Sequence, residues 1–191
     1  MCGRYFFAPT TKQLAYIISL LEKRTDTKYQ TGEIFPSHTV PIITASNNKT
    51  NITLATWGFP NTWNNGITIN ARSETIFEKQ MFKKAIVHGR CIIPASGFYE
   101  WKTLTSKEKQ KYYFTNPTNE TMYFAGVYQI FNNQCSFVIL TKEANSSMSD
   151  IHNRMPVIID GTDVHHWLYS AIDTKTLINA SSIQLQHKES I

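Results

Sequence analysis

Residues 91–141 contain five short runs rich in β-branched and aromatic side chains: CIIPA (91–95), GFYEWK (97–102), KYYFT (111–115), TMYFAGVYQI (121–130) and CSFVILT (135–141). Polar turn residues separate the runs, and such alternation at short intervals is typical of strands joined by tight connections. The stretch therefore predicts a meander or barrel-like sheet in the middle of the chain.

A helix, a β-hairpin, a short strand and a second helix are predicted before this stretch. An i, i+3, i+4, i+7 stripe of apolar residues over Thr11–Arg24 predicts an amphipathic helix. HTVPIITA (38–45) and NITLATWGF (51–59), joined by the turn SNNKT (46–50), predict a β-hairpin. GITINAR (66–72) predicts a short strand.

A second helix is predicted over Thr75–Val87, because Thr75 and Glu78 have the spacing of a capping box. After the central stretch, SSMSDIHN (146–153) predicts a helical turn and MPVIID (155–160) a strand.

The C-terminal part is expected to hold two short helices and one strand. TDVHHWLYSA (162–171) predicts a helix capped by Thr162 or Asp163. The tail from Thr174 predicts a small helix and an edge strand, SIQLQH (182–187). Because helices gather toward the ends and strands toward the middle, the fold class is α+β, with a strongly curved, mostly antiparallel β core. The length of 191 residues predicts a single domain, 1–191.

Composition excludes several classes of protein. The 19 Lys and Arg against 14 Asp and Glu give a net charge of +5, a moderate lean toward a polyanionic partner. The longest apolar runs are too short to span a bilayer and no signal segment opens the chain. We therefore expect a cytoplasmic protein, nucleoid-associated in a bacterial host, with no membrane contact.

The cysteines argue against a disulfide framework. Cys2, Cys91 and Cys135 are odd in number and lack C-x-x-C spacing, so neither a disulfide scaffold nor a zinc ribbon is expected. Cys91 and Cys135 stand in apolar runs, which favours burial as small hydrophobic residues. We expect no metal and no cofactor.

Cys2 stands in the run MCGRYF (1–6). Removal of Met1 would leave an α-amine and a thiol on one residue, a pair that no internal residue can offer. At pH 7.4 roughly a quarter of α-amines are uncharged and nucleophilic, against about a thousandth of lysine side chains. Arg4 is expected to lower the pKa of the thiol. The ordinary alternative is that Cys2 is an accident of the translation start.

Three polar residues near the ends of predicted strands are candidates for acid, base and orienting roles: Asn70, Glu100 and His152. Glu100 is flanked by aromatic residues, which predicts a raised pKa suited to proton transfer near neutral pH. Each residue alone has an ordinary reading: Asn70 closes a turn or caps a helix, Glu100 faces solvent, and His152 lies on the surface or in the core. Together with Cys2 they form a set suited to attack on a carbonyl.

Five motifs in order carry a resemblance to a known family: MCGRYF (1–6), NARSET (70–75), RCIIPASGFYEW (90–101), FAGVY (124–128) and HNRMPVII (152–159). With them the chain resembles the SOS-response-associated peptidase (SRAP) domain family. The resemblance implies recognition of abasic sites in single-stranded DNA and covalent capture of the ring-opened sugar as a thiazolidine. It also implies cysteine-type autopeptidase and lyase-like activities, with Met1 removed by the chain itself or by a cellular aminopeptidase.

The resemblance also implies roles for the candidate residues. Cys2 would be the crosslinking nucleophile, and Asn70 would position its amine or the sugar. Glu100 would act as acid and base in ring opening and imine formation, while His152 would exchange protons with sugar hydroxyls and assist reversal.

DNA contacts are expected around these groups. Arg4, Arg72 and Arg154 lie within two residues of a proposed catalytic group, so we assign them to flanking phosphates, with ordinary ion pairing as the alternative. Trp63, Trp101 and Pro36 are candidates for contact with exposed bases, whereas Trp57 is expected in the core. The segment 57–72 is shorter than is usual for the family, so the form of its loop is open.

Two other functions compete with this interpretation. A class II glutamine amidotransferase can also begin MCG and use Cys2 as an N-terminal nucleophile, although Arg4 replaces the apolar residue common there and no synthase domain follows. A passive DNA- or RNA-binding module would leave Cys2 inert. We expect a monomer whose partner is single-stranded DNA with abasic sites.

Overall fold

The computed structural model describes residues 2–24, 28–47, 49–61, 65–169, 174–180 and 183–190. Its helices and strands follow one another in this order: β1 (Tyr5–Phe7), α1 (Lys12–Glu22), β2 (Gly32–Ile34), β3 (Thr39–Ser46), β4 (Lys49–Trp57), β5 (Phe59–Pro60), β6 (Ile67–Thr68), β7 (Asn70–Arg72), α2 (Gln80–His88), β8 (Arg90–Ala95), β9 (Gly97–Thr103), β10 (Lys109–Thr115), β11 (Met122–Phe131), β12 (Gln134–Glu143), β13 (Arg154–Pro156), β14 (Ile158–Ile159), η1 (Gly161–Asp163), α3 (Val164–Tyr169), α4 (Thr174–Ala180) and β15 (Gln186–Ser190).

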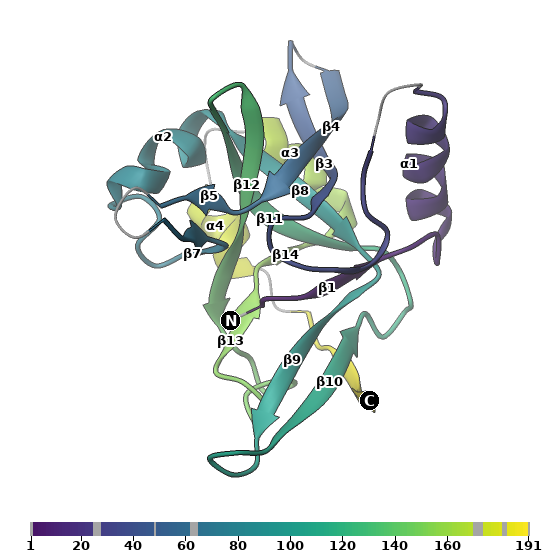
Figure 1. Ribbon diagram of the computed structural model, residues 1–191, viewed down its shortest axis with the longest axis vertical. Helices are drawn as coiled ribbons and strands as arrows, with labels where there is room; N and C mark the ends of the chain where they lie inside the picture. The colour runs from purple at the N-terminus through teal and green to yellow at the C-terminus, as the bar shows by residue number, and fades with distance from the viewer. Residues whose placement is uncertain are drawn as a thin grey trace.

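The centre of the fold is a closed barrel of five strands in the order β12-β4-β3-β8-β11, closed by pairing of β11 with β12. Adjacent strands of the barrel are antiparallel, except β4 and β12, which are parallel to each other. A second sheet, β15-β10-β9-β1-β2, adjoins the barrel, and its β9–β10 hairpin extends below it in Figure 1. The prediction of a curved, mostly antiparallel α+β fold is confirmed.

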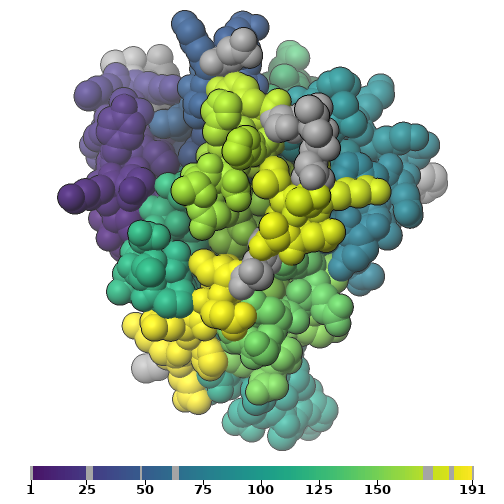
Figure 2. Space-filling model, turned by 180° about the vertical axis from the view of Figure 1, so that it is seen from behind, coloured from purple at the N-terminus to yellow at the C-terminus, as the bar shows by residue number. Residues whose placement is uncertain are grey.

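The central strands are buried on both faces, which explains why their sequences run apolar without alternation. In β12, Phe137 and Ile139 join the cluster inside the barrel and under α1, whereas Val138 and Leu140 join an outer cluster covered by α2, α3 and α4. The strand therefore needs apolar residues at successive positions. Figure 2 shows the C-terminal elements, yellow-green to yellow, spread over the back of the molecule.

Helix α1 and the hairpin β3–β4 form as predicted. Thr11 caps α1 by accepting a hydrogen bond from the backbone N–H of Leu14 at 3.2 Å. Leu14, Ile17 and Leu21 are buried. The apolar stripe thus faces the core, as the periodicity indicated.

The predicted start of the second helix was wrong. Helix α2 begins at Gln80, and Lys79 in its N-cap position makes no side-chain cap bond. The N–H groups of Glu78 and Lys79 donate instead to the carbonyl of Thr75 in turns that precede the helix. Ile76 is fully buried, so packing of these turns into the core outweighs the local capping signal.

The C-terminal elements also differ in detail. Asp160, rather than Thr162 or Asp163, caps the predicted short helix by accepting from the Thr162 N–H at 2.9 Å. The predicted strand 155–160 is split into β13 and β14 around Val157, whose backbone bonds to both Leu140 and Ala125. The last strand is β15, four residues later than predicted, where it pairs with β10.

The three cysteines are free thiols. Cys91 is fully buried, as predicted. Cys135 is only half-buried, because it lies near the start of β12 opposite the exposed Ile130. None of the helices in the described ranges is long and apolar enough to cross a membrane.

Candidate active site around Cys2

The four residues predicted to carry the chemistry meet at one place. Cys2 precedes β1, Asn70 begins β7, Glu100 lies in β9, and His152 precedes β13. Strand β1 pairs with β9, and both β7 and β13 pair with β12. Sheet pairing thus brings together residues separated by up to 150 positions in sequence.

Cys2 is fully buried in the chain that carries Met1; Met1 itself lies outside the described residues. Burial, with a smaller effect of Glu100, raises the pKa of the thiol far above its usual range, and a backbone hydrogen bond of Arg4 opposes this rise. Separately, Sγ donates to the Arg4 carbonyl oxygen at 3.7 Å. Arg4 thus lowers the thiol pKa, as expected, but through its backbone, and burial outweighs this effect. The Cys2 sulfur is held as a neutral thiol beside a carboxyl group.

Glu100 does not face solvent. Its side chain is buried, at 3% exposed, and because neighbours in a strand point to opposite faces, it points away from the half-buried Tyr99 and Trp101. Burial raises the pKa of Glu100, with His152 opposing the shift. The predicted direction was right, but its cause is burial in the interior rather than contact with those two rings.

His152 lies beside the buried carboxyl of Glu100 and is partly exposed. Its Nδ1 lies 3.0 Å from the backbone nitrogen and 3.2 Å from the carbonyl oxygen of Arg154, so it accepts from the first when unprotonated and donates to the second when protonated. Nε2 lies 4.0 Å from Oε2 of Glu100, and the His152 side chain is 25% exposed. The separation of Nε2 and Oε2 is longer than a hydrogen bond, so the ring lies close to the buried carboxyl without bonding to it through these atoms.

Asn70 neither closes a turn nor caps a helix. Its Nδ2 donates to the carbonyl oxygen of Cys2 at 2.9 Å. Its Oδ1 is buried and accepts no hydrogen bond from the described residues. A buried acceptor without a donor is unfavourable, and an amine or hydroxyl in the site would satisfy it.

The three arginines proposed to contact phosphates differ in their ion pairing and exposure. Arg154 pairs with Glu74 through both terminal nitrogens and lowers the pKa of that carboxyl. Arg4 pairs with Glu33 at 3.2 Å. Arg72 is exposed at the end of β7. The ion-pair alternative thus describes Arg4 and Arg154 in the chain without DNA.

The aromatic residues and Pro36, considered for contact with bases, differ in how deeply they are buried. Trp57 is fully buried and its Nε1 donates to the Ile69 carbonyl at 3.0 Å, as expected of a core residue. Trp101 and Pro36 are half-buried. Trp63 lies outside the described residues.

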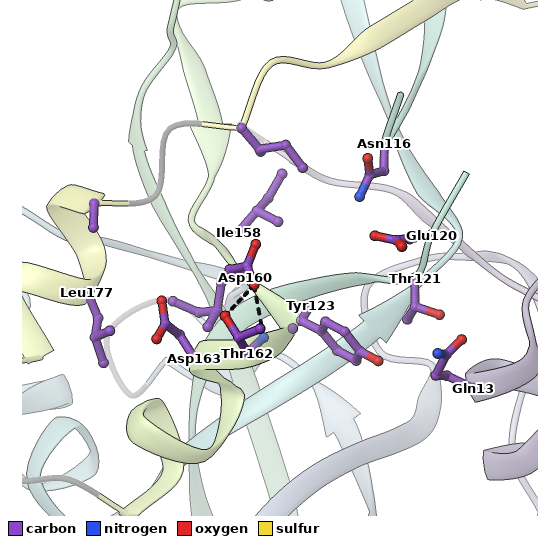
Figure 3. Close-up of a pocket in the computed structure, with 14 residues that line it drawn as sticks. Gln13, Asn116, Glu120, Thr121, Tyr123, Ile158, Asp160, Thr162, Asp163 and Leu177 are labelled. Atoms are coloured by element: carbon purple, nitrogen blue, oxygen red, sulfur yellow. Dashed lines mark hydrogen bonds between the residues drawn. The ribbon is translucent and has the colours of Figure 1, made fainter. Parts of the chain in front are cut away.

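A cavity of about 600 Å³ lies elsewhere on the molecule, and none of the four central residues lines it (Figure 3). Glu120, Asp160 and Asp163 contribute carboxylates to its wall, and Asp160 accepts from both the N–H and the hydroxyl of Thr162. Carboxylates repel phosphate, so this cavity does not suit DNA. Among the described residues no three His, Cys, Asp or Glu side chains are grouped so as to hold a metal ion.

Comparison with known proteins adds to this geometry. The family model for SOS response associated peptidase (SRAP) matches residues 1–190. The chain is 35% identical over 184 residues to the abasic site processing protein YoaM of Bacillus subtilis, covering 88% of this chain and 79% of YoaM. It is 27% identical over 186 residues to the abasic site processing protein YedK of Escherichia coli, covering 92% and 82%.

A solved structure shows the same fold. A crystal structure of a protein from Bacteroides thetaiotaomicron superposes with a TM-score of 0.79 and 22% identity, covering all of this chain and 92% of the other.

Proposed function

Since this chain belongs to the SOS response associated peptidase (SRAP) family, we propose that it recognises abasic sites in single-stranded DNA and captures them covalently through Cys2. Relatives named abasic site processing proteins support the class of substrate. The observation that carries the proposal is the convergence of Cys2, Asn70, Glu100 and His152.

The chemistry follows from an aminothiol and an aldehyde. After Met1 is removed, the Cys2 amine attacks C1′ of the ring-opened sugar to give a carbinolamine, which loses water to form an imine. The thiol then adds to the imine carbon, its proton passing to the nitrogen, and closes a five-membered thiazolidine. The net change is one protein and one strand joined with loss of one water molecule.

The surrounding residues suit the proton transfers that these steps need. Glu100, whose pKa is raised by burial, opens the sugar ring and protonates the departing hydroxyl. His152 exchanges protons with sugar hydroxyls through its exposed edge. Asn70 holds the Cys2 backbone and offers its Oδ1 to the free amine.

Intact-mass spectrometry tests the proposal. The purified protein is expected to lack Met1 and, with a single strand containing an abasic site, to gain the mass of the strand less one water. An unchanged protein mass with only non-covalent binding would indicate a passive module, and ammonia release from free glutamine would indicate an amidotransferase. A Glu100→Gln protein that still lacks Met1 completely would assign the removal to a cellular aminopeptidase.

Asn70→Ala is expected to slow adduct formation about 10-fold, equivalent to ~1.4 kcal/mol. The variant loses the hydrogen bond that holds the Cys2 carbonyl and the acceptor offered to the amine. The rate is measured by quenching timed samples and separating the products on a denaturing gel. Asn153→Ala, an exposed neighbour of His152, is the control and should react at the wild-type rate; an equally fast Asn70→Ala protein would remove Asn70 from the site.

Arg72→Gln is expected to weaken non-covalent binding and to lower the slope of log K against log salt by about 0.7, the value for one phosphate contact on a single strand. Arg72 is exposed beside Asn70 at the end of β7, so it can reach a flanking phosphate. Anisotropy titrations at several salt concentrations measure the slope. Lys84→Gln, exposed on α2, removes the same charge and should leave the slope unchanged.

A further inference from the structure

Two cations, Arg4 just before β1 and Lys111 in β10, converge on a single carboxylate oxygen. Arg4 Nη1 lies 3.2 Å and Lys111 Nζ lies 3.1 Å from Oε1 of Glu33. Glu33 comes from β2 and Lys111 from β10, with β1 and β9 between them. The three residues come from segments far apart in the chain, so the sequence did not single out Lys111 or Glu33.

The cations are held in place by rings as well as by Glu33. The Arg4 guanidinium lies 4.1 Å from the centre of the Phe35 ring and 5.1 Å from that of Trp101. Lys111 Nζ lies 4.4 Å from the centre of the Tyr99 ring. Cation–π contact stabilises both positions without a carboxylate, so the pair of cations can persist when Glu33 moves away.

An anion bound to both cations is favoured, because the two like charges repel each other and the anion attracts both. A phosphodiester carries one negative charge shared by two oxygens, as a carboxylate does, and arginine binds both. The three side chains are between 18% and 30% exposed. A phosphate from solution can therefore reach the position that the Glu33 carboxylate fills.

We propose that Arg4 and Lys111 form a binding site for one phosphate of the strand that carries the lesion, and that Glu33 occupies this site until DNA displaces its carboxylate. The inference rests on the proposed function. Arg4 is two residues from Cys2, and Trp101, which faces Arg4, directly follows Glu100. The phosphate would thus lie near the trapped nucleotide, and Glu33 would compete with every strand that enters.

The test uses a labelled single strand bearing a tetrahydrofuran residue, an abasic analogue without an aldehyde, so that anisotropy reports non-covalent binding only. Glu33→Gln is expected to bind about 5-fold to 10-fold more tightly than wild type, and Lys111→Gln about 5-fold more weakly with a salt slope lower by about 0.7. In the Glu33→Gln and Lys111→Gln double variant the gain from the glutamine should fall to about 2-fold. Glu22→Gln, exposed at the end of α1, changes the charge equally and is the control.

Thermal unfolding separates this role from a structural one. Glu33→Gln leaves two cations without their anion, so its Tm should fall while its affinity for DNA rises. The inference would be overturned if Glu33→Gln bound the strand no more tightly than Glu22→Gln does. It would also be overturned if Glu33→Gln raised the affinity as much in the Lys111→Gln background as in the wild type. Because adduct formation by the wild-type protein is measured separately, that result would leave the proposed function intact, whereas absence of any adduct would overturn both.

Discussion

Cys2→Ala should form no adduct with abasic single strands, a loss of at least about 1,000-fold in rate. The alanine variant keeps a terminal amine but has no thiol to close the ring, so any imine reverts to free aldehyde and protein. Denaturing electrophoresis after incubation measures the stable product. Cys135→Ala, which removes the half-buried thiol of β12, is the matched control and should crosslink like wild type.

Cys2→Ser separates the two nucleophiles. Its amine can still form an imine, which borohydride reduction would trap as a stable amine, but without reduction the product should be lost on heating. Since Cys2 is fully buried, the Tm of each variant is recorded to show that the fold survives. Efficient crosslinking by Cys2→Ala without reduction would place the bond on another residue and refute the assignment of Cys2.

Much of the fold could be predicted because local patterns and tertiary packing agree over the central strands and α1. The apolar runs from Cys91 to Thr141 became β8 to β12, and the Thr11 cap formed where expected. The errors lie where packing overrides local chemistry. Burial of Ile76 delays α2 to Gln80, a consequence of contacts distant in sequence that no capping pattern encodes.

The sequence predicted which four candidate residues belong together but not their electrostatics. Residue types and motif order identified Cys2, Asn70, Glu100 and His152, which the structure brings together. Which face of β9 Glu100 occupies, and the complete burial of Cys2, depend on how two sheets meet. For the same reason the contact between Lys111 and Glu33, which lie in separate strands, could not be predicted from the sequence around either residue.

Glu100→Gln is expected to slow adduct formation by roughly 100-fold, within the range for loss of a general acid–base residue. Glutamine keeps the shape of the side chain but cannot donate and recover a proton in ring opening and imine formation. Single-turnover rates across pH 5–9 measure the effect. The change of rate with pH that titration of the Glu100 carboxyl causes in the wild type should be absent from the variant. A Glu100→Gln protein that reacts at the wild-type rate would assign the proton transfers to another group.

The same substitution should stabilise the fold, and this sets a catalytic role apart from a structural one. Burial raises the pKa of Glu100 above its value in the unfolded chain, so the folded state holds the proton more tightly. The contribution of Glu100 to the free energy of unfolding is fully present below its pKa in the unfolded chain. This contribution is lost as the pH rises through its pKa in the folded protein. At pH 7.5 Glu100→Gln should therefore gain ~1 kcal/mol, or ~2–4 °C in Tm, and the difference should disappear near pH 4.

Glu74→Gln is the matched control with the opposite sign, because the hydrogen bond from Arg154 lowers the pKa of Glu74, so its loss should reduce Tm at pH 7.5. A lower Tm for Glu100→Gln at pH 7.5 would show that the ionised carboxylate stabilises the fold, contrary to the burial argument.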